Sequence, residues 1–228
     1  MSDKSTFNKC RDALQQGIYA VINPFVRLLI KIGVTPNIVT TIGLLGNAAA
    51  TAVLIYATMQ LVKSGPDFSM LTIAGILIMG FSLFDMLDGQ VARLGNMAST
   101  FGALYDSVLD RYCEMITLGG IAFYLLGMGS IWGALITFLA LIGSVMVSYV
   151  RARAEGLDIE CKVGLMQRPE RVVVTAIALI AAGIARETMV LIVAMAIIAV
   201  LANLTAFWRV AHCHRQLARK NNTANKTL

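Results

Sequence analysis

Six apolar stretches, each close to the length that a helix needs to cross a membrane, account for most of this 228-residue sequence. A helix of roughly 20 apolar residues spans the hydrocarbon core of a bilayer. The fifth stretch is shorter than that, but Pro169 suits a first helical turn, so we expect this helix to begin earlier. The sequence therefore predicts an all-α integral membrane fold with six transmembrane helices, at residues 38–61, 71–87, 101–126, 131–150, 172–185 and 189–210.

Composition agrees with a membrane fold. Hydrophobic residues make up 57% of the chain, charged residues make up only 14%, and the mean hydropathy is +0.74. A soluble domain has about a quarter of its residues charged. The net charge of +6 is expected at anionic headgroups or anionic substrates. Nucleic acid is not an expected partner, because no basic stripe with interleaved aromatic residues is present. The four cysteines lack metal-site or disulfide-framework spacing.

The ends of the chain and the joints between the stretches predict the orientation. Residues 7–31 carry apolar side chains at helical spacing with lysines and arginines between them, which indicates an amphipathic helix in the membrane interface; a plain polar leader is the alternative. Lysine and arginine gather in the N-terminal segment, in the joints after the second and fourth stretches, and in the tail. By the positive-inside rule, both termini and these joints face the cytoplasm. We therefore expect one domain at residues 37–211, between an N-terminal segment at 1–36 and a basic cytoplasmic tail at 212–228.

Four aspartates fall on the second and third stretches at helical spacing. Asp85 and Asp88 are three residues apart, and Asp106 and Asp110 are four apart, so each pair shares one helix face. Carboxylates within a membrane are costly and repel one another, and divalent cations would cancel that repulsion. The pattern predicts two divalent cations, Mg²⁺ first and Mn²⁺ as the alternative. The other interpretation is four separately solvated residues at helix ends.

The aspartates belong to a longer motif, Asp85-x2-Asp88-Gly89-x2-Ala92-Arg93-x8-Gly102-x3-Asp106-x3-Asp110. This motif resembles the signature of the CDP-alcohol phosphotransferase family. The resemblance implies a six-helix membrane enzyme, often a homodimer, that uses a CDP-activated lipid such as CDP-diacylglycerol. It also implies that all four aspartates bind metal and that Asp110 is the base that takes the proton from the attacking hydroxyl. The residues that it assigns to the CDP-lipid are Asn37, Ile38, Val39, Thr40, Gly89, Arg93 and Ser99. Asn37 stands where an aspartate is common.

The basic joint after the fourth stretch bears on the acceptor alcohol. This joint resembles the same region of bacterial phosphatidylinositol phosphate synthases. The resemblance implies that the phosphate of inositol 1-phosphate is held by Arg151, Arg153, Arg168 and Arg171, and that the products are phosphatidylinositol phosphate and CMP. Position 151 is Arg where that subgroup usually has Lys. Guanidinium groups suit phosphate oxygens in any case.

Other interpretations stay open at this stage. The positive-inside rule alone would place arginines in this joint. The acceptor can be glycerol 3-phosphate, serine or another alcohol. A different class of protein, an ion-coordinating channel or transporter, would also use intramembrane aspartates. For the enzyme, we expect a site near the cytoplasmic face of the cell inner membrane.

Overall fold

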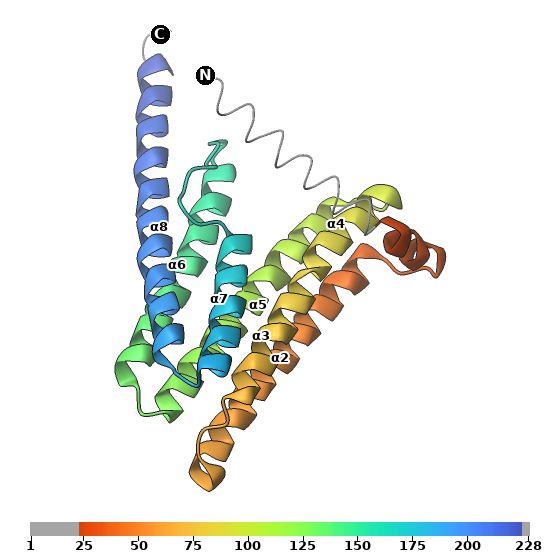
Figure 1. The fold of residues 1–228 in the computed structure, drawn as a ribbon. Coiled ribbons are helices and arrows are strands. Elements are labelled where there is room, and N and C mark those ends of the chain that lie inside the picture. The colour runs from red at the N-terminus through yellow and green to blue at the C-terminus, as the bar shows by residue number, and fades with distance from the viewer. Residues whose placement is uncertain (1–22, 225–228) are drawn as a thin grey trace, which may run out of the picture. The chain divides into compact units, whose positions relative to one another are not determined.

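The regular structure of the chain is helical throughout the described region. The computed structural model describes residues 23–224, without the side chains of Val62, Asp85, Arg219 and residues 221–224. A helix at residues 23–31 comes first, and most of the predicted amphipathic helix lies outside the described residues. The elements that follow are α2 (Pro36–Ser64), α3 (Ser69–Ser82), α4 (Phe84–Leu94), α5 (Thr100–Gly127), α6 (Ile131–Glu155), α7 (Arg168–Ala185) and α8 (Met189–Ala224), as Figure 1 shows.

Each predicted apolar stretch lies within these helices. The second stretch is divided, because α3 ends at Ser82 and α4 begins at Phe84. The fifth helix begins at Arg168, with Pro169 in its first turn as expected. The last helix continues past residue 210 to Ala224, so the segment predicted as a tail is helical where the structure describes it.

Four segments of the described chain are long and apolar enough to cross a membrane. They are Pro36–Leu61, Ser69–Leu94, Ile131–Glu155 and Met189–Ala218. Helices α5 and α7 are not among them, and both carry several charged residues. Helix α5 contains Asp106 and Asp110, two of the four predicted aspartates, and α7 has three charged residues in its first turn. The structure therefore supports a membrane protein, with four candidate spans in the described region, and six spans stay a prediction.

The chain divides into two compact units. The first comprises residues up to Leu45, of which 23–45 are described, together with Phe81–Asp110. Its small apolar core joins the helix at residues 23–31 to the start of α2 and to α4, through the buried side chains of Val26, Val39, Leu87 and Val91. The second unit comprises Gly46–Gly80 and the chain from Arg111 onward.

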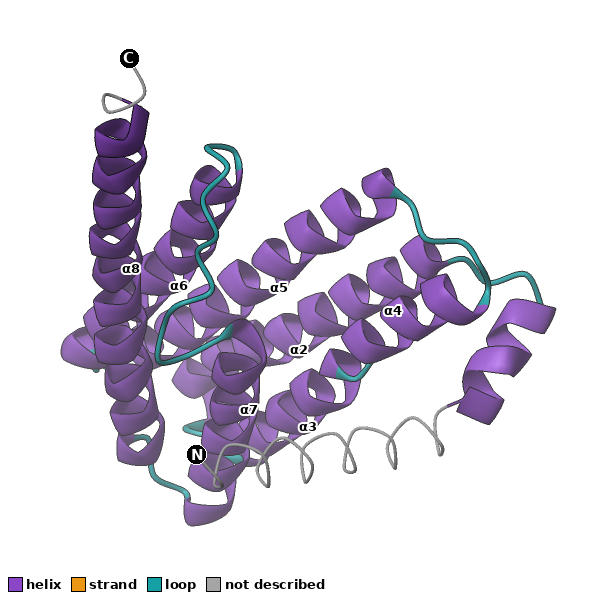
Figure 2. Cartoon of the chain, turned by 90° about the horizontal axis from the view of Figure 1, so that it is seen from above, coloured by secondary structure: helices purple, strands orange, loops and turns teal. Residues whose placement is uncertain are grey.

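Small residues let the helices of the second unit pack closely. Helix α8 packs against α6 and α7, and α6 and α8 lie side by side in Figures 1 and 2. A Cβ atom added at Gly143 of α6 would lie 2.6 Å from Nδ2 and 2.9 Å from the backbone N of Asn203 on α8. Close packing over small residues is how membrane helices gain contact area. Large apolar side chains cover the outside of the helices, as expected where lipid replaces water; examples are Ile76, Phe138, Leu139 and Phe207.

The basic joint between α6 and α7 is an extended loop that runs along α8 (Figure 2). Side chains of α8 bind its backbone. Arg209 is 5% exposed, and its Nε donates to the Val163 carbonyl of the loop (2.8 Å), while a terminal nitrogen donates to the Val147 carbonyl of α6 (2.6 Å). Lys220 donates to the Asp158 carbonyl (2.8 Å). The loop is thus held by hydrogen bonds to α8 rather than by secondary structure of its own.

Candidate active site

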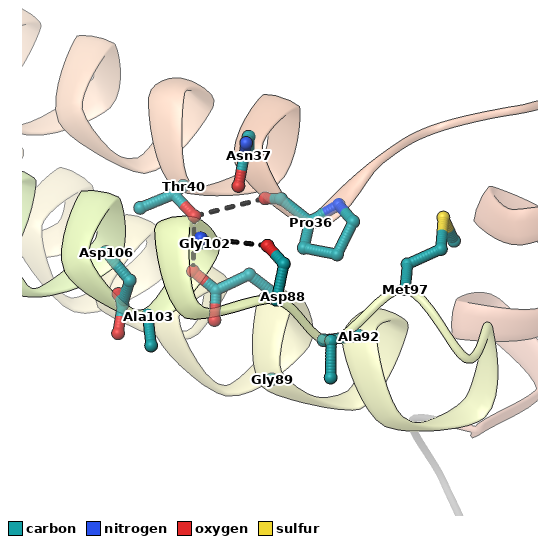
Figure 3. A pocket seen from close by; sticks show the side chains of 12 residues that line it. Pro36, Asn37, Thr40, Asp88, Gly89, Ala92, Met97, Gly102, Ala103 and Asp106 are labelled. Carbon is teal, nitrogen blue, oxygen red and sulfur yellow. Dashed lines mark hydrogen bonds between the residues drawn. The ribbon is translucent and has the colours of Figure 1, made fainter.

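A pocket in the first unit gathers much of the predicted motif (Figure 3). It has a volume of about 220 Å³. The start of α2, the middle of α4, the loop after α4 and the start of α5 supply the lining residues, which are Pro36, Asn37, Thr40, Asp88, Gly89, Ala92, Met97, Ala98, Ser99, Gly102, Ala103 and Asp106.

One buried hydrogen bond joins α2 to Asp88 of α4. The Thr40 hydroxyl lies 2.7 Å from Oδ2 of Asp88 and 3.0 Å from the Pro36 carbonyl. A hydroxyl has one proton to donate, and the closer carboxylate oxygen is the better acceptor. Thr40 and Asp88 are 5% and 6% exposed. The bond therefore fixes the rotamer of Asp88 from a helix distant in sequence.

Two helix N-termini open onto the pocket. Pro36 is the first residue of α2, and Ser99 immediately precedes α5. The Ser99 hydroxyl accepts a hydrogen bond from the backbone N–H of Gly102 (2.9 Å), which is the contact of an N-cap residue. A helix N-terminus carries partial positive charge and unpaired N–H groups, so it favours anions. This end of the pocket suits phosphate oxygens.

Several residues that line the pocket are glycines or alanines, which leave space for a ligand. An added Cβ at Gly102 would lie 3.0 Å from the Ser99 hydroxyl and 3.4 Å from Oδ1 of Asn37. An added Cβ at Gly89 would lie 3.4 Å from a terminal nitrogen of Arg93. Because larger residues would fill this space, the glycines of the motif allow a ligand to approach the backbone.

The four predicted aspartates are placed differently. Asp88 and Asp106 line the pocket, and Asp110 is half-buried on α5 outside the lining set. The side chain of Asp85 lies outside the described part of the chain. Among the side chains that are described, no group of three or more metal-ligating residues converges. Asp88 and Asp106 nevertheless supply the hard carboxylate oxygens that divalent cations prefer, so this donor set fits such an ion.

The residues predicted to bind the CDP-lipid separate into two groups. The pocket is lined by Asn37, Thr40, Gly89 and Ser99. The others are not among the lining residues: Ile38 is exposed, Val39 is buried in the core of the first unit, and Arg93 is exposed, with its Nε donating to the Gly89 carbonyl (3.1 Å).

The four predicted acceptor arginines also differ in their surroundings. Arg151 and Arg153 are exposed near the end of α6, and Arg151 forms an ion pair with Glu155 (2.9 Å). Arg168 is half-buried at the first position of α7. Arg171 is only 1% exposed, and its guanidinium forks onto Glu114 of α5.

Sequence reasoning overlooked two buried charges. Glu114 lies in the third apolar stretch, four residues after Asp110, and a further carboxylate within that stretch was the available signal. Arg209 falls at the end of the last predicted stretch, next to the basic tail, and the structure buries it against the loop backbone. Nothing in its local sequence distinguishes it from the solvated arginines that follow.

Comparison with known proteins assigns the family. Residues 33–212 match the CDP-alcohol phosphatidyltransferase family model. The chain belongs to this family. The transferase is 36% identical over 168 residues to the phosphatidylinositol phosphate synthase of Cutibacterium acnes, covering 73% of this chain and 75% of that protein. The membrane enzyme class predicted from the aspartate motif is thereby confirmed.

Solved structures give the same result. The transferase superposes with a TM-score of 0.74 on the Mycobacterium tuberculosis phosphatidylinositol phosphate synthase with CDP-DAG bound, at 26% identity, covering 85% of this chain and 94% of that one. A structure of that protein in complex with manganese and citrate gives a TM-score of 0.72 at 27% identity, covering 83% and 87%. Together with the family match, this likeness supports divalent metal ions for the transferase.

Proposed function

We propose that the transferase moves the phosphatidyl group of CDP-diacylglycerol onto inositol 1-phosphate, giving phosphatidylinositol phosphate and CMP. The observation that carries this proposal is the pocket where Asp88 and Asp106 meet the N-termini of α2 and α5. Carboxylates attract divalent cations and helix N-termini attract phosphate oxygens, so one small cavity suits both halves of a metal–diphosphate complex. The CDP-DAG bound to the M. tuberculosis synthase supports the same donor here.

The chemistry follows from the residues of the motif. The acceptor hydroxyl attacks the phosphorus that bears the lipid, the bond from that phosphorus to the bridging oxygen breaks, and CMP departs with the electron pair. Asp110 takes the hydroxyl proton, because a carboxylate within hydrogen-bond reach activates a weak nucleophile. Divalent cations held by Asp85, Asp88, Asp106 and Asp110, with Mg²⁺ favoured over Mn²⁺, would neutralise the diphosphate and stabilise departing CMP.

The acceptor assignment depends on the basic joint of the second unit. Arg151 and Arg153 are exposed near the end of α6, where Arg151 pairs with Glu155, and Arg168 and Arg171 lie at the start of α7. Guanidinium pairs bidentately with phosphate oxygens, which favours a phosphorylated alcohol over serine. Relatives named phosphatidylinositol phosphate synthase favour inositol 1-phosphate over glycerol 3-phosphate.

We further infer six spans in the cell inner membrane, with both termini and the active site cytoplasmic, and a homodimeric assembly. The distribution of lysine and arginine supports the orientation. The described helix at residues 23–31 buries Val26 completely and exposes Phe25 and Leu28 by about half. One face of this helix therefore packs on protein while the other offers apolar surface to lipid, as an interfacial helix requires.

The decisive experiment measures CMP release by detergent-purified protein from CDP-diacylglycerol with inositol 1-phosphate, glycerol 3-phosphate or serine, in Mg²⁺ or Mn²⁺. We expect metal-dependent release with inositol 1-phosphate that is lost in Asp110→Asn. Arg153→Ala should weaken use of the acceptor more than use of the CDP-lipid. Lys162→Ala, which removes an exposed cation of the loop that follows α6, is the matched control. Preference for another acceptor would refute the assignment, and no release with any acceptor would favour an ion-coordinating protein.

A further inference from the structure

A buried ion pair links α5 to the start of α7 within the second unit. Nε and a terminal nitrogen of Arg171 donate to the two carboxylate oxygens of Glu114, at 2.6 and 3.0 Å. The other terminal nitrogen donates to the Met166 carbonyl, at 3.2 Å. The side chains of Arg171 and Glu114 are 2% and 6% exposed. All three nitrogens of the guanidinium thus have acceptors, two of them on the Glu114 carboxylate and one at the Met166 carbonyl near the end of the basic loop.

The position of Arg171 makes this partner necessary. Arg171 lies in the first turn of α7, where the helix dipole disfavours a positive charge. Glu170 is its neighbour in sequence but is already engaged, because its carboxylate accepts the backbone N–H of Gln167 (2.8 Å) in the capping box of the helix. Glu114 therefore supplies the negative charge that keeps Arg171 folded against α5.

Through Arg171, Glu114 also holds the loop. Met166 lies near the end of the loop whose backbone binds side chains of α8, and Arg168 begins α7 two residues later. If the guanidinium lost its carboxylate, a buried unpaired charge would remain, and the side chain would leave its place to reach water. Met166 would then lose its donor, and the start of α7 would lose its anchor to α5.

We propose that Glu114 is a positioning residue for the anionic acceptor, which it serves by fixing Arg171 and the start of α7 without touching substrate. This inference rests on the proposed function of the basic joint. It predicts a selective defect: acceptor use depends on the geometry of the joint, whereas the CDP-lipid is assigned to residues of the first unit.

The test compares Glu114→Gln and Glu114→Asp in the full-length, detergent-purified enzyme. We expect Glu114→Gln to raise the KM for inositol 1-phosphate about tenfold or more, because loss of one partner of a buried charge pair weakens whatever the pair holds in place. The KM for CDP-diacylglycerol should change less than about twofold, because the CDP-lipid is assigned to residues of the first unit, whereas Glu114 belongs to the second. Glu114→Asp keeps the charge and should lie closer to wild type. Asn203→Leu is the control, because it removes a hydrogen bond between α6 and α8 away from the joint.

Several outcomes would overturn the inference: equal changes in both KM values, a fall in kcat alone, or Glu114→Asp behaving like Glu114→Gln. If Glu114→Gln does not fold, the double variant Glu114→Leu/Arg171→Met replaces the pair with apolar residues of similar volume, which often restores stability. Wild-type acceptor binding by that variant would also refute the role. A wild-type enzyme that uses no anionic acceptor would instead refute the proposed function, whatever Glu114 does.

Discussion

Replacing Thr40 with valine tests whether the bond between α2 and α4 matters for activity. Valine has the same shape but no hydroxyl, so the variant removes the 2.7 Å contact to Oδ2 of Asp88 while keeping the packing. A hydrogen bond to a charged group contributes about 1.5–3 kcal/mol. At 1.4 kcal/mol for each factor of ten, Thr40→Val should lower activity about 10- to 100-fold. Removal of the group that orients a metal-binding side chain has effects of the same size, on the order of 10–100-fold.

The assay is CMP release as a function of Mg²⁺ concentration. We expect Thr40→Val to need more Mg²⁺ for half-maximal rate, and Thr40→Ser, which restores the hydroxyl, to recover most of the activity. Thr58→Val is the matched control, because the hydroxyl of this buried threonine in the same helix donates to the Leu54 carbonyl, one turn earlier in α2, and not to another helix. Wild-type metal dependence in Thr40→Val, or an equal loss in Thr58→Val, would refute the reasoning.

Three further predictions concern packing and thiol chemistry. Gly102→Ala should lower CMP release at least about tenfold by narrowing the pocket, whereas Gly119→Ala on the same helix, where a Cβ meets nothing within 4 Å, should leave the rate unchanged. Gly143→Ala should lower the melting temperature by roughly 2–10 °C, because overpacking costs about 1–3 kcal/mol; Gly80→Ala, which has open space, is the comparison, and equal melting temperatures would contradict the packing. Burial raises the pKa of the Cys161 thiol to about 11, with the Cys213 thiol adding to the effect. Since the neutral thiol is favoured below that pKa, about one thousandth is thiolate at pH 8; alkylation followed by mass spectrometry should be slow there and accelerate up to about pH 11, and rapid labelling at pH 8 would disprove it.

The helices could be predicted from the sequence because their cause is local. A long run of apolar residues must satisfy its own backbone hydrogen bonds in lipid, and a helix does so within the segment. Helices α6 and α8 accordingly begin at the predicted residues, Ile131 and Met189. The division between α3 and α4 was missed, since the apolar pattern runs on through both.

The aspartate motif could be read as a site for a similar reason. Spacings of three and four residues place side chains on one helix face whatever the rest of the fold does. The structure places Asp88 and Asp106 in the lining of one pocket. A metal site formed by the four aspartates stays a prediction.

Other features depend on partners that are distant in sequence. Thr40 was grouped with its neighbours as a nucleotide contact, yet its hydroxyl binds an aspartate 48 residues away. Val39 is adjacent to Thr40 and faces the core, because successive helix positions point in different directions. No local pattern reveals which residue of such a run meets which helix.

The sequence by itself determined the membrane class, most of the helices and the family. Long apolar runs and the spacing of the motif residues are local properties, which extend over only a few helical turns. Only the tertiary structure decided which charges are buried. Arg171 and Arg209 resemble the solvated arginines around them in sequence, but packing removes both from water and gives each a partner, Glu114 for one and backbone carbonyls for the other. The cost of desolvating a charge is met by contacts between helices, and those contacts exist only once the helices have assembled.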